Sequence, residues 1–242
     1  MAIVLFTDFG SNDLYVGQLE AVFDRDAPGV RVIHLLHEAP KFNPRAGAHL
    51  LAALVGRMPR GHVYVAVVDP GVGGARDAVT IEADDSWFVG PDNGLLSVVA
   101  ARAASCRVWR VSQPPAGISA SFHGRDLFAP LAAAIARGKL PDDFVARTPE
   151  LAVSLGGGDL EEIIYLDHYG NAFTGIRARG IPGTRRLVVR GREIGHGSVF
   201  SAVAHGAEFW YENSLGLVEI AVSGGSAAQV LGLAVGEAVA WA

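Results

Sequence analysis

Short apolar runs alternate with segments of helical period along the first 140 residues. The strand-like runs are residues 3–7, 30–35, 63–68 and 108–111. The segments with apolar residues at helical spacing, each near a glycine or proline that can end a helix, are residues 14–25, 45–57 and 126–137. Such alternation predicts an α/β fold with a mainly parallel sheet and flanking helices.

The pattern changes after the prolines and glycines near residue 150. Short strand-like runs follow, punctuated by Gly and Asn with no convincing helix between them, at residues 162–166, 186–189, 207–212, 217–222 and 237–241. A small all-β domain, sandwich or barrel, is the expected result. We therefore predict an N-terminal α/β domain over residues 1–150 and a smaller C-terminal all-β domain over residues 160–242.

Composition and charge narrow the classes of partner. Half of the 242 residues are hydrophobic and 19% are charged, which predicts a globular protein with a real core. The formal net charge is −5, and the longest basic run is the pair Arg185 and Arg186. Nucleic acids and anionic membrane surfaces are therefore not expected partners.

The cellular compartment is predicted from three features: a signal peptide, membrane-spanning helices and the number of cysteines. The apolar N-terminal run lacks a basic leader and meets Asp8 at once, so it is typical of a strand rather than a signal peptide. Apolar stretches fall short of the roughly 18 residues that a membrane helix needs. The single Cys106 cannot form an internal disulfide. We expect a cytoplasmic protein.

Carboxylates follow two of the predicted strands, where an open parallel sheet collects its ligands. By itself, Asp8 is equally compatible with a turn or a helix cap. Asp69 precedes Pro-Gly and glycine-rich residues that match neither the dinucleotide fingerprint nor the P-loop. Arg76, seven residues further on, could fold back onto Asp69 as an ion pair.

Three further segments carry only weak signals when each is taken alone. His123 lies in Phe-His-Gly-Arg-Asp before an apolar helix, where a structural histidine and an acidic helix start are the ordinary interpretation. Residues 167–171 and 213–216 resemble hairpin turns.

Taken together and in order, five motifs resemble those of the S-adenosylmethionine hydroxide adenosyltransferase family, the hydrolytic relatives of the bacterial fluorinase and chlorinase. The resemblance covers nearly the whole chain, and its motifs are Thr-Asp-Phe-Gly at 7–10, Val-Val-Asp-Pro-Gly-Val-Gly at 67–73, Pro-Asp-Asn-Gly-Leu at 91–95, Phe-His-Gly-Arg-Asp at 122–126 and Asp-His-Tyr-Gly-Asn at 167–171. It implies hydrolysis of S-adenosyl-L-methionine to adenosine and L-methionine by in-line SN2 attack of water on C5′. It further implies a homotrimer in which the α/β domain and the barrel-like β domain of neighbouring subunits enclose the substrate.

The resemblance also assigns residues. The catalytic set of family members that use water falls on Asp69, Arg76 and His123. The residues carried over as substrate contacts are Asp8 for the ribose hydroxyls, Phe42 beside the sugar or base, Asp167 for the methionine ammonium, and Asn171, Ser214, Glu219 and Val222 for adenosine or methionine. No metal or other cofactor is expected, because the His and Asp residues lack a recognisable zinc-ligand spacing.

Two alternatives remain open at this stage, and a scaffold is a weaker case than either. A nucleophilic halogenase is disfavoured, because by resemblance the positions of Asp69 and His123 hold tyrosine in halogenases, and a carboxylate repels halide in a low-dielectric pocket. An adenosyl-ligand binding protein without turnover predicts binding without product, and a scaffold gives no reason for polar residues at strand ends.

His123 is the expected proton acceptor, since Arg76 would stabilise Asp69 as a carboxylate. A pre-formed hydroxide held by all three groups is the other possibility.

Overall fold

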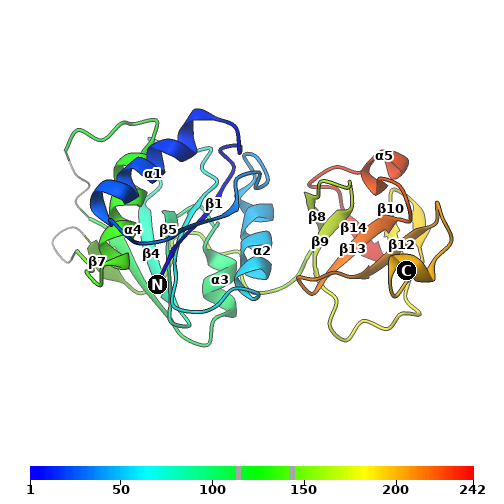
Figure 1. The fold of residues 1–242 in the computed structure, drawn as a ribbon. Coiled ribbons are helices and arrows are strands. Elements are labelled where there is room, and N and C mark those ends of the chain that lie inside the picture. Colours follow the sequence, from blue (N-terminus) through cyan, green and yellow to red (C-terminus); the bar gives the residue numbers. More distant parts are fainter. Residues whose placement is uncertain (113–115, 142–144) are drawn as a thin grey trace. The chain divides into compact units, whose positions relative to one another are not determined.

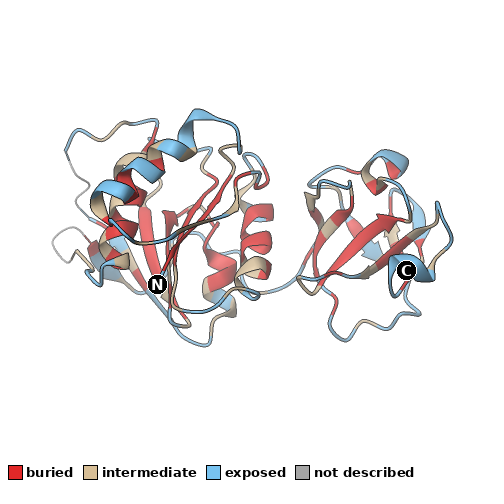
Figure 2. Ribbon diagram, viewed as in Figure 1, coloured by how far each residue is buried: buried red, intermediate tan, exposed pale blue. Residues whose placement is uncertain are grey.

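A computed structural model describes residues 1–112, 116–141 and 145–242. Contacts between Cα atoms divide the chain into two compact units, the first comprising residues 1–51 and 58–157 and the second residues 52–57 and 158–242. Buried residues concentrate along the strands of both units (Figure 2). Each unit is described by itself.

The described strands of the first unit form one mixed sheet of seven strands (Figure 1), in the order β2-β1-β3-β5-β4-β6-β7. In chain order they are β1 (Ile3–Thr7), β2 (Val32–Leu36), β3 (Val63–Val67), β4 (Ala78–Ala83), β5 (Ser86–Pro91), β6 (Cys106–Val111) and β7 (Val145–Thr148). The predicted α/β class is confirmed. The pairings β1–β2, β1–β3 and β3–β5 are parallel, whereas β4–β5, β4–β6 and β6–β7 are antiparallel, so the sheet is mixed rather than mainly parallel.

A tight hairpin explains the antiparallel half. Asp84 and Asp85 join β4 to β5 with φ angles of 45° and 68°, the left-handed pair that a two-residue hairpin turn requires. Asp-Asp is a less familiar signal for this turn than Asn-Gly, so the sequence pattern did not indicate it.

Helices cover both faces of this sheet, with α1 (Leu14–Asp26) and α4 (Ala129–Ala136) on one side and α2 (Pro44–Val55) and α3 (Ser97–Arg102) on the other (Figure 1). The three predicted helices correspond to α1, α2 and the segment ending in α4. Helix α1 begins after Asp13, whose Oδ1 accepts a hydrogen bond from the Leu14 backbone N–H at 2.6 Å. A π-helix, Gly124–Phe128, leads directly into α4.

Strand β1 is buried on both faces. Leu5 belongs to an apolar core with Leu19 of α1 and Leu131 of α4. Phe6 points the other way, 3.9 Å from the position a Cβ would take at Gly47 in α2. Burial on both faces accounts for the unbroken apolar run of this strand, since parallel strands in α/β sheets are covered on each side.

The second unit is built from antiparallel strands. A four-stranded sheet has the order β12-β13-β9-β8, and a three-stranded sheet has the order β11-β10-β14, among the residues described. Their bounds are β8 (Leu160–Leu166), β9 (Ala172–Arg177), β10 (Leu187–Val189), β11 (Arg192–Ile194), β12 (Glu208–Glu212), β13 (Leu217–Val222) and β14 (Val239–Trp241).

Isolated bridges join the edges of these two sheets. The Ile163 N–H of β8 donates to the Glu237 carbonyl beside β14 at 2.8 Å, and the Gly197 N–H after β11 donates to the Trp210 carbonyl of β12 at 3.0 Å. The strands therefore follow one another around an apolar core that includes Trp210 and Ile220. This ring of edges has the barrel-like character expected from the sequence.

The expectation that no helix interrupts the second half was wrong. A five-residue helix, α5 (Ala227–Leu231), begins after Ser226, whose Oγ accepts from the Gln229 N–H at 3.2 Å. A single 3-10 turn, η2 (Phe200–Ala202), precedes β12. Elements this short do not complete enough turns for an apolar periodicity to appear in the sequence.

Candidate active site

The predicted site residues of the first unit meet at the carboxyl ends of two adjacent parallel strands. Asp8 follows β1, and Asp69 lies two residues beyond β3. The Asp8 N–H donates to the Val67 carbonyl at 3.2 Å, which holds the two strand ends side by side. Strand β1 lies between β2 and β3, so this edge is the kind of position where open α/β sheets bind ligands.

A cavity of about 570 Å³ opens at this edge. Four predicted residues line it: Asp8, Phe42, Asp69 and His123. The other lining residues are Phe9, Gly10, Asn12, Asp13, Tyr15, Glu38, Lys41, Val67, Val72, Ser121, Phe122 and Gly124. The volume lies in the range typical of small-molecule pockets.

Arg76 joins the two central groups. Its Nε lies 3.1 Å from both Oδ1 and Oδ2 of Asp69, and its Nη2 also contacts Oδ2. The same Nη2 lies 2.9 Å from Nδ1 of His123. The Asp69 and Arg76 side chains are only 4% and 11% exposed, so this ion pair is shielded from solvent. The structure therefore brings Asp69, Arg76 and His123 into one connected group.

The loop between Asp69 and Arg76 depends on glycine for its path. Gly73 has a φ of +76°, and a Cβ there would overlap the backbone carbonyl of Ala120. The absence of a side chain lets this loop lie directly against the segment that precedes His123. The glycines of this loop match no phosphate-binding motif, and Gly73 allows the close packing of two loops.

The Arg76 contact defines the proton position on the His123 ring. A guanidinium is a donor only, so Nδ1 must accept, and the neutral ring then carries its proton on Nε2. Burial lowers the pKa of His123, and the positive charge of Arg76 lowers it further, against the smaller opposing influence of Asp69 and Asp126. The neutral, Nε2-protonated imidazole is the form this site favours.

Asp8 lies in a partly desolvated position. Burial raises its pKa, and the nearby Asp69 charge also raises it, whereas the hydrogen bond from the Phe42 N–H to Oδ2, at 3.2 Å, acts in the opposite direction. Phe42 itself has a φ of +57° and is 77% exposed. An aromatic side chain held out from a left-handed backbone position is unusual and often marks a functional site.

Three aromatic rings form one wall of the cavity. Phe9, Tyr15 and Phe122 pack against one another with ring centroids 5.2 to 5.7 Å apart. Two of the three contacts are edge-to-face, an arrangement that aromatic pairs favour. Phe9 and Phe122 lie in two of the family motifs, but their contact with each other and with Tyr15 carries no signal in the sequence.

The predicted residues of the second unit gather around a different cavity, of about 770 Å³. Its lining includes all five of them: Asp167, Asn171, Ser214, Glu219 and Val222. Other lining residues are Tyr169, Phe173, Phe200, Tyr211, Asn213, Gly224 and Gly225.

Glu219 is the most buried acid of this second cavity, with 2% of the residue exposed. The Tyr211 hydroxyl donates to Oε1 at 2.6 Å, and Nδ2 of Asn213 donates to Oε2 at 2.9 Å. Burial raises the pKa of Glu219, while these two hydrogen bonds lower it. Tyr211 and Asn213 were not among the predicted site residues, although Asn213 lies in a turn motif that was noted.

Asp167 organises its own turn. Its Oδ1 accepts from the backbone N–H groups of Tyr169, at 2.9 Å, and Asn171, at 2.8 Å. Oδ2 accepts from Nδ2 of Asn171 at 3.1 Å. The hairpin-turn interpretation of this segment is therefore correct, and a carboxylate remains at the cavity wall.

The sequence pattern also did not indicate a polar chain that runs from the buried Thr7 and His37 to the exposed His34 and Glu20. Thr7 Oγ1 lies 2.8 Å from Nδ1 of His37, whose Nε2 lies 2.8 Å from Nδ1 of His34, and Nε2 of His34 contacts Glu20 at 2.8 Å. Glu20 is an acceptor, so Nε2 of His34 donates to it. With both rings neutral, Nδ1 of His34 then accepts from Nε2 of His37, and Nδ1 of His37 accepts from the Thr7 hydroxyl. The chain supports the strand end that carries Asp8.

Within residues 1–112, 116–141 and 145–242, side chains of His, Cys, Asp and Glu nowhere gather in threes in a way that could hold a metal ion. Among the helices described, none combines the length and apolar character needed to span a membrane.

Comparison with known proteins decides the family. The model for the N-terminal domain of SAM hydroxide adenosyltransferases matches residues 3–145, and the model for the C-terminal domain matches residues 161–240.

The chain belongs to the SAM hydroxide adenosyltransferase family.

Relatives with a curated name extend this match over the whole chain. The (R)-S-adenosyl-L-methionine hydrolase of Thermus thermophilus is 36% identical over 96% of this chain and 95% of that protein. The enzyme of the same name from Salinispora arenicola is 38% identical over 96% of this chain and 94% of its own length. The crystal structure of an uncharacterized conserved protein from Thermotoga maritima superimposes with a TM-score of 0.89 at 30% identity, covering 99% of both chains.

Proposed function

We propose that this member of the SAM hydroxide adenosyltransferase family hydrolyses S-adenosyl-L-methionine to adenosine and L-methionine. The hydrogen-bonded group of Asp69, Arg76 and His123 at a cavity beside Asp8 carries this proposal. The names of the relatives specify the (R) sulfonium, so we propose the same epimer as the substrate. The chain is accordingly an enzyme that uses water on an adenosyl sulfonium.

In the proposed reaction, water attacks C5′ in line with the C–S bond. The C–O bond forms as the C–S bond breaks, and methionine leaves as a neutral thioether with the bonding electron pair. Because the sulfonium is already a good leaving group, the protein mainly needs to align the nucleophile and exclude competing water, and alignment alone can contribute about 7–11 kcal/mol.

The contact between Arg76 and Nδ1 of His123 refines the role of the imidazole. A neutral ring with its proton on Nε2 donates to the attacking oxygen and does not accept a proton at that nitrogen. This disfavours His123 as the general base and makes its ring a donor that orients the attacking water together with Asp69 and Arg76. The proton of the attacking water passes to Asp69, because an alkyl oxonium is a far stronger acid than a carboxylic acid, and then to solvent.

Asp8 and Phe42 are proposed to bind the sugar. The two carboxylate oxygens of Asp8 suit the 2′ and 3′ hydroxyls, and its position next to the catalytic group suits a ribose whose C5′ faces Asp69. The exposed ring of Phe42 would border the sugar or base. For these roles Asp8 must be ionised, since a carboxylate accepts two strong hydrogen bonds.

In the second unit, Asp167 is proposed to hold the methionine ammonium. Adenosine or methionine contacts are proposed for Asn171, Ser214, Glu219 and Val222. The support is that all five residues line one cavity and that the C-terminal family model spans them. We retain residues 1–150 as the domain with the catalytic set and 160–242 as the domain with these contacts.

We further propose a cytoplasmic homotrimer in which neighbouring subunits complete each site. The family resemblance suggests the trimer, and exposed apolar residues beside the first cavity support an interface there. Leu14, Tyr15, Phe42 and Val72 are 64%, 38%, 77% and 36% exposed. The free thiol of Cys106 suits a reducing compartment.

Incubation with each sulfonium epimer of S-adenosyl-L-methionine in ¹⁸O-labelled water, with and without chloride, tests the proposed reaction. The expected products are methionine and adenosine with ¹⁸O at C5′, independent of chloride. Asp69→Ala and His123→Ala should lose turnover by on the order of 10²-fold or more while binding changes less. Asp77→Asn is the matched control, because Asp77 pairs with Arg110 at the surface at 3.4 Å.

Halogenated adenosine would instead identify a halogenase, and binding without product would identify a ligand-binding protein. Full activity in both the Asp69 and His123 variants would contradict the proposed catalytic group.

A further inference from the structure

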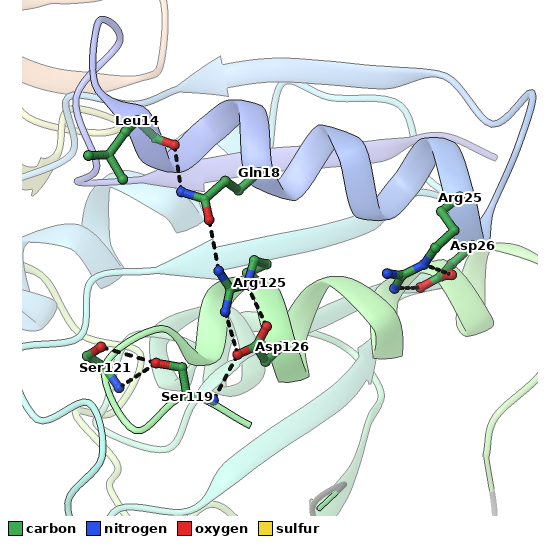
Figure 3. A network of polar contacts seen from close by, with 8 residues as sticks. All are labelled: Leu14, Gln18, Arg25, Asp26, Ser119, Ser121, Arg125 and Asp126. Atoms are coloured by element: carbon green, nitrogen blue, oxygen red, sulfur yellow. Dashed lines mark hydrogen bonds and ion pairs between the residues drawn. The ribbon is translucent and has the colours of Figure 1, made fainter. Parts of the chain in front are cut away.

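Arg125 and Asp126, which follow His123 closely in the chain, belong to a polar network (Figure 3). Asp126 accepts from Arg125 Nε at 2.6 Å and from Arg125 Nη2 at 2.9 Å. Oδ2 of Asp126 also accepts from the Ser119 backbone N–H at 2.8 Å. The Asp126 carboxylate therefore connects Arg125, two residues after His123, to Ser119, four residues before it.

Arg125 extends this network to helix α1. Its Nη1 donates to Oε1 of Gln18 at 2.9 Å, and Nε2 of Gln18 donates to the Leu14 carbonyl at 3.0 Å (Figure 3). The guanidinium also lies 5.4 Å from the ring centroid of Phe122. Because Arg is a planar donor fork, it can hold the carboxylate and the amide at the same time.

The turn that contains these residues has an unusual form. Residues Gly124–Phe128 form a π-helix, and the Ala129 N–H closes it by donating to the Gly124 carbonyl. Such wide turns occur frequently at functional sites. Here His123 lies directly before the turn and contacts Arg76. Arg125 contacts Gln18 of α1, and Asp126 contacts the backbone N–H of Ser119.

A second pair of adjacent Arg and Asp residues makes the same kind of bidentate contact but has no side-chain link to the turn of His123. Arg25 donates to both carboxylate oxygens of Asp26 at 2.7 Å, again between adjacent residues (Figure 3). This pair lies at the last turn of α1, and Arg25 is 68% exposed. An isolated exposed pair of this kind contributes little to stability.

We propose that Gln18, Arg125 and Asp126 form a positioning clamp that sets the His123 ring relative to Arg76. The clamp joins α1, the residue 119 turn and the π-helix, so that loosening it displaces His123 without removing any group that contacts the nucleophile. These three are positioning residues, and their kinetic role rests on the proposed hydrolysis.

Arg125→Gln and Arg25→Gln are compared by steady-state kinetics with S-adenosyl-L-methionine. We expect Arg125→Gln to lower kcat by on the order of 10- to 100-fold with little change in KM, since a displacement of about 1 Å can cost that much. Arg25→Gln makes the same chemical change outside the clamp and should retain wild-type kinetics. Equal kcat values in the two variants would overturn the proposal.

Gln18 provides a second test that preserves the Arg125–Asp126 pair, so it remains informative if Arg125→Gln does not fold. Gln18→Leu removes the amide acceptor and should lower kcat, whereas Gln18→Glu keeps an oxygen for Arg125 and should restore it. A kcat that is equally low in both, with a matching loss of thermal stability, would indicate a structural role only and overturn the clamp.

The ring nitrogens of His123 give a readout that is independent of turnover. In ¹⁵N NMR spectra, with the signal assigned by its loss in His123→Asn, the wild-type ring should show protonated Nε2 and unprotonated Nδ1. Arg125→Gln should shift these signals toward tautomer averaging, and unchanged signals would contradict the clamp. If the wild type does not hydrolyse the substrate, the proposed function fails while this measurement still decides the clamp.

Discussion

Asp8 shows how a single residue can favour function over stability. Its pKa is raised chiefly by burial, so the folded protein holds the neutral form better than the unfolded chain does. The proposed ribose contact needs the ionised form. The charge therefore costs stability at neutral pH, and this cost disappears as the pH falls toward the ordinary value of 3.8.

We expect Asp8→Asn to stabilise the protein and weaken substrate binding. An asparagine keeps an oxygen for the Phe42 N–H but carries no charge, so Tm at pH 7 should rise by roughly 1–3 °C. The gain should shrink as the pH falls through the raised pKa toward 3.8. KM should increase about tenfold or more, because charged hydrogen bonds to the ribose are lost.

Thermal unfolding at a series of pH values, together with KM at pH 7, checks this expectation. Asp24→Asn is the control, since Asp24 is exposed on α1. A lower Tm for Asp8→Asn at pH 7 would show that the Asp8 charge stabilises the fold.

At the scale of elements, two loops bring the proposed catalytic group together. One runs from Asp69 to Arg76 and the other precedes His123. Strand pairing places Asp69 at the sheet edge, but the contact between Arg76 and His123 depends on how closely the loops approach. Gly73 controls that approach, because a side chain there would meet the Ala120 carbonyl.

We expect Gly73→Ala to separate the loops and lower kcat by about tenfold or more. Gly61→Ala is the matched control, because Gly61 has a similar φ of +82° and nothing within 4 Å of the added methyl group. Both variants carry the backbone strain of about 1–2 kcal/mol for alanine in the left-handed region. Only Gly73→Ala adds the steric overlap, so a similar kcat in both variants would show that loop approach does not limit catalysis.

At the scale of the whole molecule, each of the two units has its own core and its own cavity. The predicted residues divide between these cavities, five lining the second while Asp8, Phe42, Asp69 and His123 line the first. The proposed homotrimer would supply both groups to one substrate. Apolar side chains exposed beside the first cavity, Leu14 among them, are the surface such an assembly would cover.

We expect light scattering to give a solution mass of three times 25.4 kDa. Leu14→Glu should lower both mass and activity, because it places a charge on the surface proposed to be buried. Val230→Glu alters an apolar residue that is 53% exposed on α5 and serves as the control. A monomer with full activity would contradict the proposed assembly.

Local patterns allowed much of the fold to be predicted. The apolar runs that became β1, β3 and β13 and the helical spacing of α1 and α2 are short-range signals, since side-chain burial repeats with the period of the element. Turns and short helices that depend on one or two residues were harder to predict. The Asp84–Asp85 turn and the helix after Ser226 were missed, because each depends on a few backbone angles rather than on a repeat.

The sequence by itself determined the α/β and all-β halves, the family motifs and the identity of Asp69, Arg76 and His123 as candidates. Only the tertiary structure decided that Arg76 contacts His123 across 47 positions, which nitrogen of the ring accepts that contact, and that Gln18 of α1 contacts Arg125. Periodicity records which face of an element is buried and is therefore legible along the chain. Hydrogen bonds between distant segments depend on how the loops and sheets pack, and that geometry exists only once the chain has folded.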